Sequence, residues 1–266
     1  MDLVQLIILA LIQGITEFLP VSSSAHLILV PLLTDWQDQG LAIDVAAHIG
    51  SLFAVVLYFR KDISRILFAG IISIIKKDVS DSNSKLFWYL AFSSLPVLII
   101  GFLLRDIVSI YFRNPLIIAV ASIGFGLLLW YADVAGKRIR QVDSINIRDA
   151  IIIGFAQVLA LVPGTSRSGI TITAGLLLGL DRKSAARFSF LMSVPIILAA
   201  GGYESIKLIR MDTIVDMHDF FITGFLSAIS ALITIHIFLK FLDKIGMLPF
   251  VIYRIVLGIF LFYIFI

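Results

Sequence analysis

Long runs of apolar residues, separated by short polar segments, dominate the chain. A helix that crosses a bilayer needs about 20 mainly apolar residues, and several runs reach about that length. The runs are continuous, whereas the strands of a membrane barrel would alternate between apolar and polar positions. The pattern therefore predicts six transmembrane helices, over Ile43–Phe59, Leu86–Leu104, Leu116–Tyr131, Phe188–Tyr203, Phe220–Leu239 and Met247–Ile266.

Two further apolar regions, Leu3–Leu33 and Ala150–Leu180, are each broken in the middle by a polar turn. The first turn is Pro20–His26 and the second is Pro163–Gly169. Each half is too short to span a bilayer alone. Non-helical backbone at membrane depth is tolerated only where it is buried in protein or lines a wet cavity. We therefore predict two re-entrant helix–loop–helix hairpins.

The distribution of lysine and arginine predicts the orientation. One set of loops (60–86, 133–149, 181–187 and 240–245) holds 15 of these residues, whereas the alternate set (34–43, 103–114 and 203–219) holds 4. Cytoplasmic loops carry the excess of positive charge, so the first set is expected inside the cell. Both termini are then expected outside, with the first hairpin entering from outside and the second from the cytoplasm.

The whole chain, 1–266, is predicted to form a single membrane domain in which a hairpin followed by three spans occurs twice. An odd number of spans in each half inverts the second half relative to the first. Residues 1–133 and 149–266 are therefore predicted to be inverted repeats. Inverted repeats with interrupted helices place their binding site where the interrupted segments meet.

The composition agrees with a membrane protein and excludes other classes. Hydrophobic residues make up 60% of the chain and charged residues 15%, against about 45–50% and about 25% in soluble domains. Soluble globular and disordered proteins are therefore excluded, and the absence of cysteine excludes a disulfide scaffold and a thiolate site. The net charge of +3 does not indicate nucleic-acid binding, because the positive residues form short clusters between apolar runs.

The first hairpin contains the residues best suited to proton transfer and nucleophilic attack. Glu17 is an ionisable group at membrane depth, which makes it a functional candidate; the alternative is a solvated carboxylate near the outer interface. Gln13 lies one helical turn earlier, on the same face. Three serines, Ser22, Ser23 and Ser24, follow Pro20, and His26 follows them. One of these serines is expected to cap a helix, but a hydroxyl near a base is also the basis of nucleophilic catalysis.

The second hairpin contains an arginine among small hydroxyl residues and glycines. Backbone N–H groups at a helix start attract phosphate, and a guanidinium binds it with two hydrogen bonds. Arg167, with Thr165, Ser166 and Ser168, is therefore a candidate anion clamp; the alternative is an arginine that pairs with a carboxylate for folding. Together the hairpins offer a base, a nucleophile and a phosphate clamp, which indicates phosphoryl transfer. Other polar residues in or near the spans are expected to make structural contacts: Asp44, His48, His236 and Arg254.

The segments Gln13–His26 and Pro163–Gly169 closely resemble the undecaprenyl-diphosphate phosphatases of the bacitracin-resistance family. The family's (Glu/Gln)-x-x-x-Glu motif falls on Gln13 and Glu17. Its Pro-x-Ser-Ser-x-x-His motif falls on Pro20–His26, and its Pro-Gly-x-Ser-Arg-Ser-Gly motif falls on Pro163–Gly169. The resemblance covers essentially the whole length. It implies an integral membrane hydrolase with six spans and two re-entrant hairpins, which converts undecaprenyl diphosphate to the monophosphate and phosphate. That reaction recycles the lipid carrier for peptidoglycan synthesis and confers bacitracin resistance.

By this resemblance, Ser23 is expected to be the nucleophile and Glu17 the acid–base group or a metal-associated carboxylate. His26 is expected to assist proton transfer, and Arg167 to hold the diphosphate. Binding of the diphosphate is further expected from Gln13, Ser22, Ser24, Thr165, Ser166 and Ser168. The alternative chemistry makes His26 the nucleophile through a phosphohistidine. A divalent cation, Mg²⁺ or Ca²⁺, is expected to bridge the diphosphate and Glu17, because hard cations prefer oxygen ligands.

The partners implied are the isoprenoid diphosphate and membrane lipid, and a homodimer is compatible with the sequence. The expected location is the plasma (inner) membrane, with the active site opening to the periplasmic or outer side. The competing class is a transporter, either an anion carrier or a flippase, because inverted repeats and broken helices fit it equally well. A carrier does not need the cluster of Glu17, serines and His26, so that cluster favours the enzyme.

Overall fold

The structure is a computed structural model that describes residues 1–34, 36–210 and 215–266. Within these residues the regular elements are all helices, and no strand forms. Six helices are long and apolar enough to cross a membrane, and each overlaps one predicted span, although three of them (α5, α9 and α10) extend several residues beyond it at both ends. The chain is therefore an all-α polytopic membrane protein. The six helices are α3 (Gly40–Tyr58), α5 (Ser82–Tyr111), α6 (Pro115–Ala135), α9 (Arg182–Arg210), α10 (Met217–Ile245) and α11 (Leu248–Phe265).

The two interrupted regions each form a pair of short helices joined by a turn. The first pair is α1 (Leu3–Thr16) with α2 (Ser23–Leu33), and the second is α7 (Ile147–Val158) with α8 (Arg167–Leu177). A short 3₁₀ turn, η2 (Leu159–Leu161), follows α7. The helix–loop–helix form is as predicted, whereas the re-entrant placement of the hairpins in a bilayer stays a prediction.

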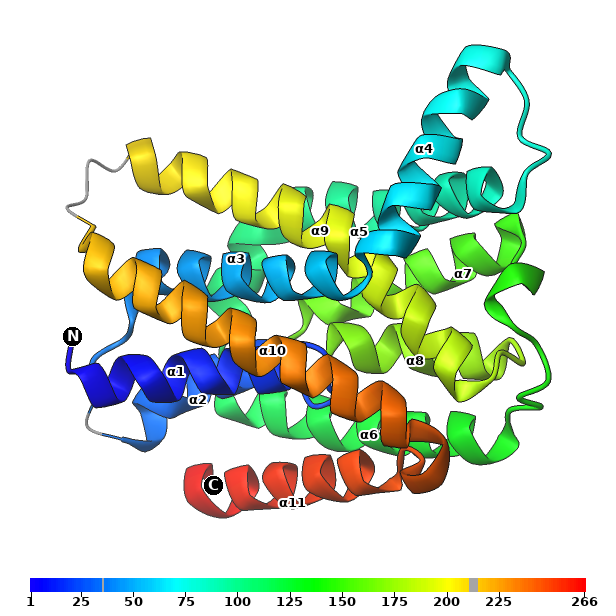
Figure 1. The fold of residues 1–266 in the computed structure, drawn as a ribbon. Coiled ribbons are helices and arrows are strands. Elements are labelled where there is room, and N and C mark those ends of the chain that lie inside the picture. Colours follow the sequence, from blue (N-terminus) through cyan, green and yellow to red (C-terminus); the bar gives the residue numbers. More distant parts are fainter. Residues whose placement is uncertain (35, 211–214) are drawn as a thin grey trace.

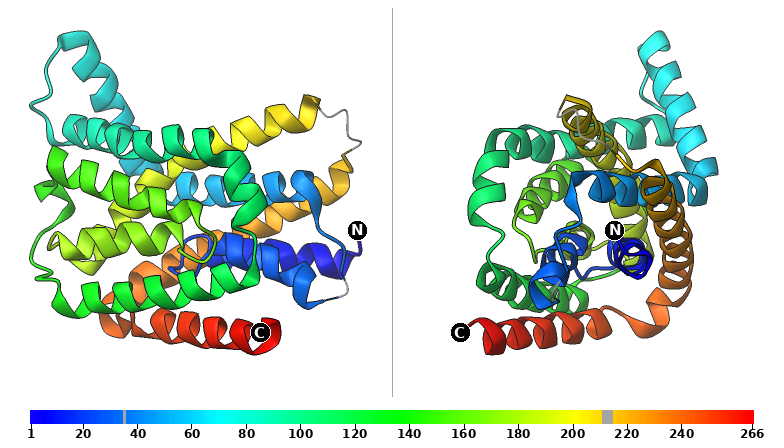
Figure 2. Two further views of the ribbon diagram at one scale, coloured as in Figure 1. Left: turned by 180° about the vertical axis from the view of Figure 1, so that it is seen from behind. Right: turned by 90° about the vertical axis from the view of Figure 1, so that its left-hand side faces the viewer.

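The turns of the two hairpins meet in the middle of the molecule. α1 and α2 extend from one end of the bundle and α7 and α8 from the other (Figure 1), and the view from behind agrees (Figure 2). The backbone N–H of Gly164 donates to Ser22 Oγ at 3.1 Å, and Ser168 Oγ donates to the carbonyl oxygen of Leu19 at 2.8 Å. Segments about 145 residues apart in the chain therefore form one junction.

The segment 60–86, predicted as a loop, contains a further helix, α4 (Arg60–Lys76). It projects from the bundle at the end opposite to the N-terminus (Figure 1). Five charged residues interrupt its apolar positions (Arg60, Lys61, Asp62, Arg65 and Lys76), which kept it below the hydropathy of a span. The connection 136–146 also holds a 3₁₀ turn, η1 (Val142–Ser144). Both termini lie toward the end away from α4 (Figures 1 and 2).

A buried carboxylate ties three helices together near the predicted cytoplasmic end. Asp133, at the end of α6, accepts two hydrogen bonds from the guanidinium of Arg182, at 2.6 and 2.8 Å, where α9 begins. It also accepts from the backbone N–H of Met247, immediately before α11, at 3.2 Å. Since all three bonds end on one carboxylate, Asp133 fixes the positions of α6, α9 and α11 relative to one another.

Candidate active site

Glu17 lies at the centre of the junction between the hairpins, at the C-terminal end of α1. Its Oε1 accepts from Arg167 Nη2 at 2.8 Å, across the junction. Its Oε2 accepts from Ser23 Oγ at 2.6 Å and from Gln13 Nε2 at 3.0 Å. Phe18, the next residue, is fully buried and packs edge-on against Phe190 of α9, which holds this end of α1 in place. The carboxylate is therefore oriented by three donors.

The serines of the first turn have different surroundings. Ser23 directs its hydroxyl to Glu17, whereas Ser22 accepts the N–H of Gly164 and lies 3.3 Å from the hydroxyl of Ser24. Ser22 has a φ of 75°, in the left-handed region that is strained for a residue with a side chain. It is the N-cap residue of α2, so this strained backbone sets the direction in which α2 leaves the junction.

The second turn repeats this arrangement at Ser166, which is the N-cap residue of α8 and has a φ of 70°. Its Oγ accepts from the N–H of Gly169 at 3.1 Å. The N-terminal ends of α2 and α8 therefore both begin at the junction, and helix N-termini attract anions. Arg167, the first residue of α8, also donates to the carbonyl oxygen of Ser189 at 3.3 Å.

Two of the predicted binding residues serve the contact between hairpins or are buried behind it. Ser168 is fully buried, and its hydroxyl donates to Leu19. Thr165 is also fully buried, and its hydroxyl has no hydrogen-bond partner among the described residues. Neither of these side chains lines the cavity described next, and nor does the fully buried Gln13, which was also predicted to bind the diphosphate.

A cavity of about 570 Å³ begins at the junction, where Glu17, Ser23 and Arg167 line it together with Ser22, Ser24 and Ser166. Its remaining wall comes from α3, α9, η2, the connection before α3 and the connection between α5 and α6. Asp38 and Arg113, which line it, belong to the loops 34–43 and 103–114 that the charge count places outside. The cavity therefore leads from the junction toward the end of the bundle where the termini lie.

The polar wall of the cavity includes residues that the sequence analysis did not assign to the site. Asp44 and His48 were expected to form a structural pair. His48 Nδ1 donates to the backbone carbonyl of Asp44 at 2.7 Å, while the Asp44 carboxylate accepts from Gln39 at 2.9 Å, and both side chains line the cavity. Their spacing of four residues on an apolar helix was the signal available. Glu204 and Lys207 of α9 line the same wall, and no motif marked them.

His26 lies away from Glu17, on the side of α2 that faces α11. Its Nδ1 donates to the carbonyl oxygen of Ser22 at 2.7 Å, which leaves Nε2 for a second partner. Nε2 lies 2.5 Å from the hydroxyl of Tyr253, and the two rings stack at 5.6 Å. The imidazole is not among the groups that line the cavity. The position of His26 close to Glu17 in sequence does not bring the two side chains together.

Arg254 connects the two turns from behind. It is fully buried in α11, and within the described residues all its hydrogen bonds go to carbonyl oxygens. Nη1 donates to Pro20 in the first turn at 3.2 Å, and Nη2 donates to Gly164 in the second at 2.8 Å. A side chain at Gly169 would come within 2.9 Å of Nη1, so glycine leaves the space that Arg254 needs. The packing contact expected of Arg254 is therefore found at one specific place, between the two turns.

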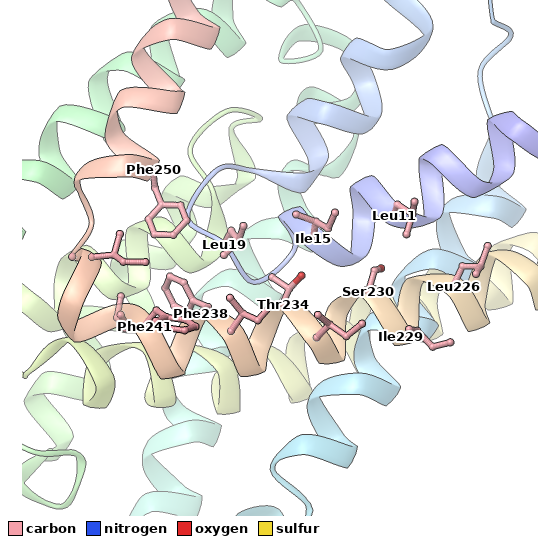
Figure 3. A pocket seen from close by; sticks show the side chains of 15 residues that line it. Leu11, Ile15, Leu19, Leu226, Ile229, Ser230, Thr234, Phe238, Phe241 and Phe250 are labelled. Atoms are coloured by element: carbon pink, nitrogen blue, oxygen red, sulfur yellow. The ribbon is translucent and has the colours of Figure 1, made fainter.

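An apolar groove lies on the other side of the first hairpin, between α1, α10 and α11 (Figure 3). Its volume is about 520 Å³, and its wall is almost entirely aliphatic and aromatic. Leu19, at one side of the groove, stands three residues before Ser22 of the cavity. Ile15 and Leu11 of α1 face Ser230 and Thr234 of α10 across it (Figure 3). The groove has the shape and polarity for a hydrocarbon chain.

Comparison with known proteins identifies the family. The profile of the family described as Bacitracin resistance protein BacA matches residues 6–260. The chain belongs to this family. Undecaprenyl-diphosphatase of Thioalkalivibrio sulfidiphilus is 52% identical over the full length of both chains. Undecaprenyl-diphosphatase 1 of Pseudoalteromonas translucida is 51% identical over 97% of each chain, and undecaprenyl-diphosphatase of Nitrosococcus oceani is 49% identical over the full length of both. The resemblance to the bacitracin-resistance family is thus confirmed.

Proposed function

We propose that the protein hydrolyses undecaprenyl diphosphate to undecaprenyl phosphate and inorganic phosphate, and so recycles the lipid carrier and confers bacitracin resistance. The observation that carries the proposal is the arrangement of Ser23, Glu17 and Arg167. A hydroxyl donates to a carboxylate at 2.6 Å, and a guanidinium from the other hairpin donates to the same carboxylate at 2.8 Å. BacA relatives of the same length that carry the name undecaprenyl-diphosphatase give independent support.

The first step is attack of Ser23 Oγ on the terminal phosphorus of the diphosphate. Glu17 Oε2 accepts the hydroxyl proton while the new O–P bond forms. The bond from this phosphorus to the bridging oxygen breaks, and undecaprenyl phosphate leaves. Water then attacks the phosphoserine, and Ser23 Oγ leaves with the proton that Glu17 held. The products are inorganic phosphate and the unchanged enzyme.

Arg167 changes partner in this mechanism. In the structure its guanidinium donates to Glu17 Oε1. The diphosphate offers several anionic oxygens, which match the planar fork of the guanidinium better than one carboxylate oxygen does. The transfer of Arg167 to the diphosphate frees Glu17 to accept a proton. The N-terminal ends of α2 and α8, with Ser22, Ser24 and Ser166, complete the anion site, while Gln13 orients the carboxylate.

Ser23 is favoured over His26 as the nucleophile by position. Ser23 lines the cavity and contacts a base, whereas His26 Nε2 faces the hydroxyl of Tyr253 outside the cavity wall. His26 then acts through its bond to the Ser22 carbonyl, which supports the turn that carries Ser23. A phosphohistidine would require the imidazole to turn away from both of its present partners.

A divalent cation, Mg²⁺ or Ca²⁺, fits the same site. Glu17 would hold it together with diphosphate oxygens, and the neighbouring Gln13 Oε1 is a buried oxygen without a hydrogen-bond partner among the described residues. The cation would neutralise part of the negative charge that builds up on the transferred phosphoryl group. The one cluster of three metal-binding side chains among the described residues is Asp216, His218 and Asp219, and none of these lines the cavity.

We place the protein in the plasma (inner) membrane, with the cavity opening to the outer or periplasmic side. The support is the charge distribution, because the loops that border the cavity belong to the set that is poor in lysine and arginine. The isoprenoid tail is proposed to lie in the apolar groove of α1 and α10, beside the diphosphate. Thr234→Trp would fill this groove. It should raise KM for the C55 substrate and leave KM for a short-chain diphosphate unchanged; equal effects on both would contradict the assignment.

The proposed function is tested with purified protein in mixed micelles, by phosphate release from a C55 diphosphate. The wild type should release phosphate, and Ser23→Ala should lose nearly all turnover. Ser94→Ala is the matched control, because Ser94 is a buried serine whose hydroxyl donates only within α5. Its activity should equal that of the wild type. Absence of phosphate release, with substrate flux across liposomes containing the protein, would instead establish the transporter reading.

A further inference from the structure

Helix α4 has a large apolar face that nothing in the described structure covers. This outer face consists of Leu67, Phe68, Ile71, Ile74 and Ile75, and the most exposed of them are Phe68 (68%) and Ile75 (74%). With 17 residues and several charges, α4 is not one of the helices suited to cross the membrane. The lipid around a transmembrane helix therefore does not account for this face, and another apolar surface must cover it.

The opposite face of α4 is fixed to the bundle. Gly70 lies against the ring of Phe87 so closely that an added side-chain carbon would come within 2.3 Å of it. The indole of Trp88 donates to Ser73 Oγ at 3.1 Å. Near its start, Asp62 pairs with Arg187 of α9 at 3.1 Å. These contacts on α5 and α9 set the rotation of α4, so the outer face points away from the protein.

A basic flank borders the outer face. Lys61, Arg65 and Lys76 are all exposed. At 3.6 residues per turn they fall within about 60° of the helix circumference, between the outer face and the buried face. Each lacks an ion pair among the described residues. A helix with an apolar face beside a basic flank lies in the plane of a membrane surface and is attracted by anionic lipids.

We propose that α4 is an interfacial helix that binds anionic phospholipid, with the outer face among the acyl chains and the basic flank at the phosphate groups. Its loop belongs to the lysine- and arginine-rich set, so the lipid is that of the cytoplasmic leaflet. The proposal does not depend on the proposed phosphatase activity, because α4 contributes no side chain to the cavity.

The test uses the full-length protein in phosphatidylcholine nanodiscs with a fixed fraction of phosphatidylglycerol. The chain has no cysteine, so Phe68→Cys carries a single fluorophore. In one sample the phosphatidylglycerol is brominated, and in the other an equal fraction of the phosphatidylcholine is brominated. The quantity compared is the quenching ratio, which is the quenching by brominated phosphatidylglycerol divided by that by brominated phosphatidylcholine. Phosphatidylglycerol should quench at least about threefold more effectively, because each of the three cations adds to the attraction. High salt should reduce this quenching ratio, because salt screens the attraction between the cations and the anionic lipid.

The matched variants separate the basic flank from general charge. In the Phe68→Cys background, Lys61→Gln with Arg65→Gln and Lys76→Gln should bring the ratio close to one. Replacement of three exposed cations on other predicted cytoplasmic segments, Arg148, Lys240 and Lys244, by Gln should leave it unchanged.

Equal quenching by both lipids in the wild-type background would overturn the proposal. So would a ratio that stays unchanged in the flank variant or at high salt. Weak quenching by both lipids, with disulfide formation between two copies of the unlabelled Phe68→Cys protein, would overturn it as well, because a second protein molecule would then cover the outer face.

Discussion

Removal of the Arg254 side chain should destabilise the junction between the hairpins. In Arg254→Met, four carbonyl oxygens lose a donor. Those of Ala121 and Ser122 belong to turns of α6 and keep their bonds within the helix. Those of Pro20 and Gly164 lie in the two turns and keep no comparable partner. A buried group without a hydrogen bond costs roughly 1–3 kcal/mol, so the two together predict a loss of about 2–6 kcal/mol.

This loss would be measured as the free energy of unfolding in detergent micelles. Arg254→Lys keeps the charge but replaces the planar fork by one ammonium group, so its stability should lie between those of Arg254→Met and the wild type. Arg148→Met serves as the control, because this arginine is exposed, and its effect should stay within about 0.5 kcal/mol. An Arg254→Met protein as stable as the control would refute the reasoning, since the two turns would then be held together without the arginine.

Three further predictions concern the active site and the topology. Arg167→Lys keeps a charge but loses charge-assisted hydrogen bonds worth roughly 1.5–3 kcal/mol each. Its kcat/KM should therefore fall about tenfold or more. A kcat/KM near that of the wild type would contradict the role of Arg167 as the diphosphate clamp. His26→Ala should retain more phosphate release than Ser23→Ala, and the reverse order would support a phosphohistidine. Asp38→Cys should react with an impermeant thiol reagent in intact cells and Lys77→Cys should not, whereas the opposite labelling would reverse the orientation.

The spans were predictable because the information lies within each run of apolar residues. A helix such as α6 is apolar along almost all of its length, and no tertiary contact is needed to recognise it. The breaks were equally local, since Pro20 and Pro163 with their polar neighbours cannot continue an apolar helix. The meeting of Glu17 with Arg167 followed from the predicted topology, because each lies in the turn of a hairpin.

Features that depend on which side a helix turns to its neighbours were not predictable. His26 follows Ser23 by three residues, yet its ring packs on Tyr253 of a helix about 230 residues later. The lining of the cavity by His48 and Lys207 depends on how α3 and α9 pack. α4 was missed as a helix, because its buried face became apparent only against Phe87 and Trp88 of α5.

The bonds of Arg254 also constrain the order in which the protein can be completed. Pro20 leaves the ribosome early, whereas Arg254 stands 12 residues from the last residue of the chain. At roughly 5–20 residues per second, synthesis of the intervening segment takes roughly 10–50 s. During that interval the first turn lacks Arg254, and until residue 164 is made it lacks Gly164 as well. A nascent chain that stalls before α11 therefore has Glu17, Ser23 and Arg167 but lacks the arginine that bonds to both turns.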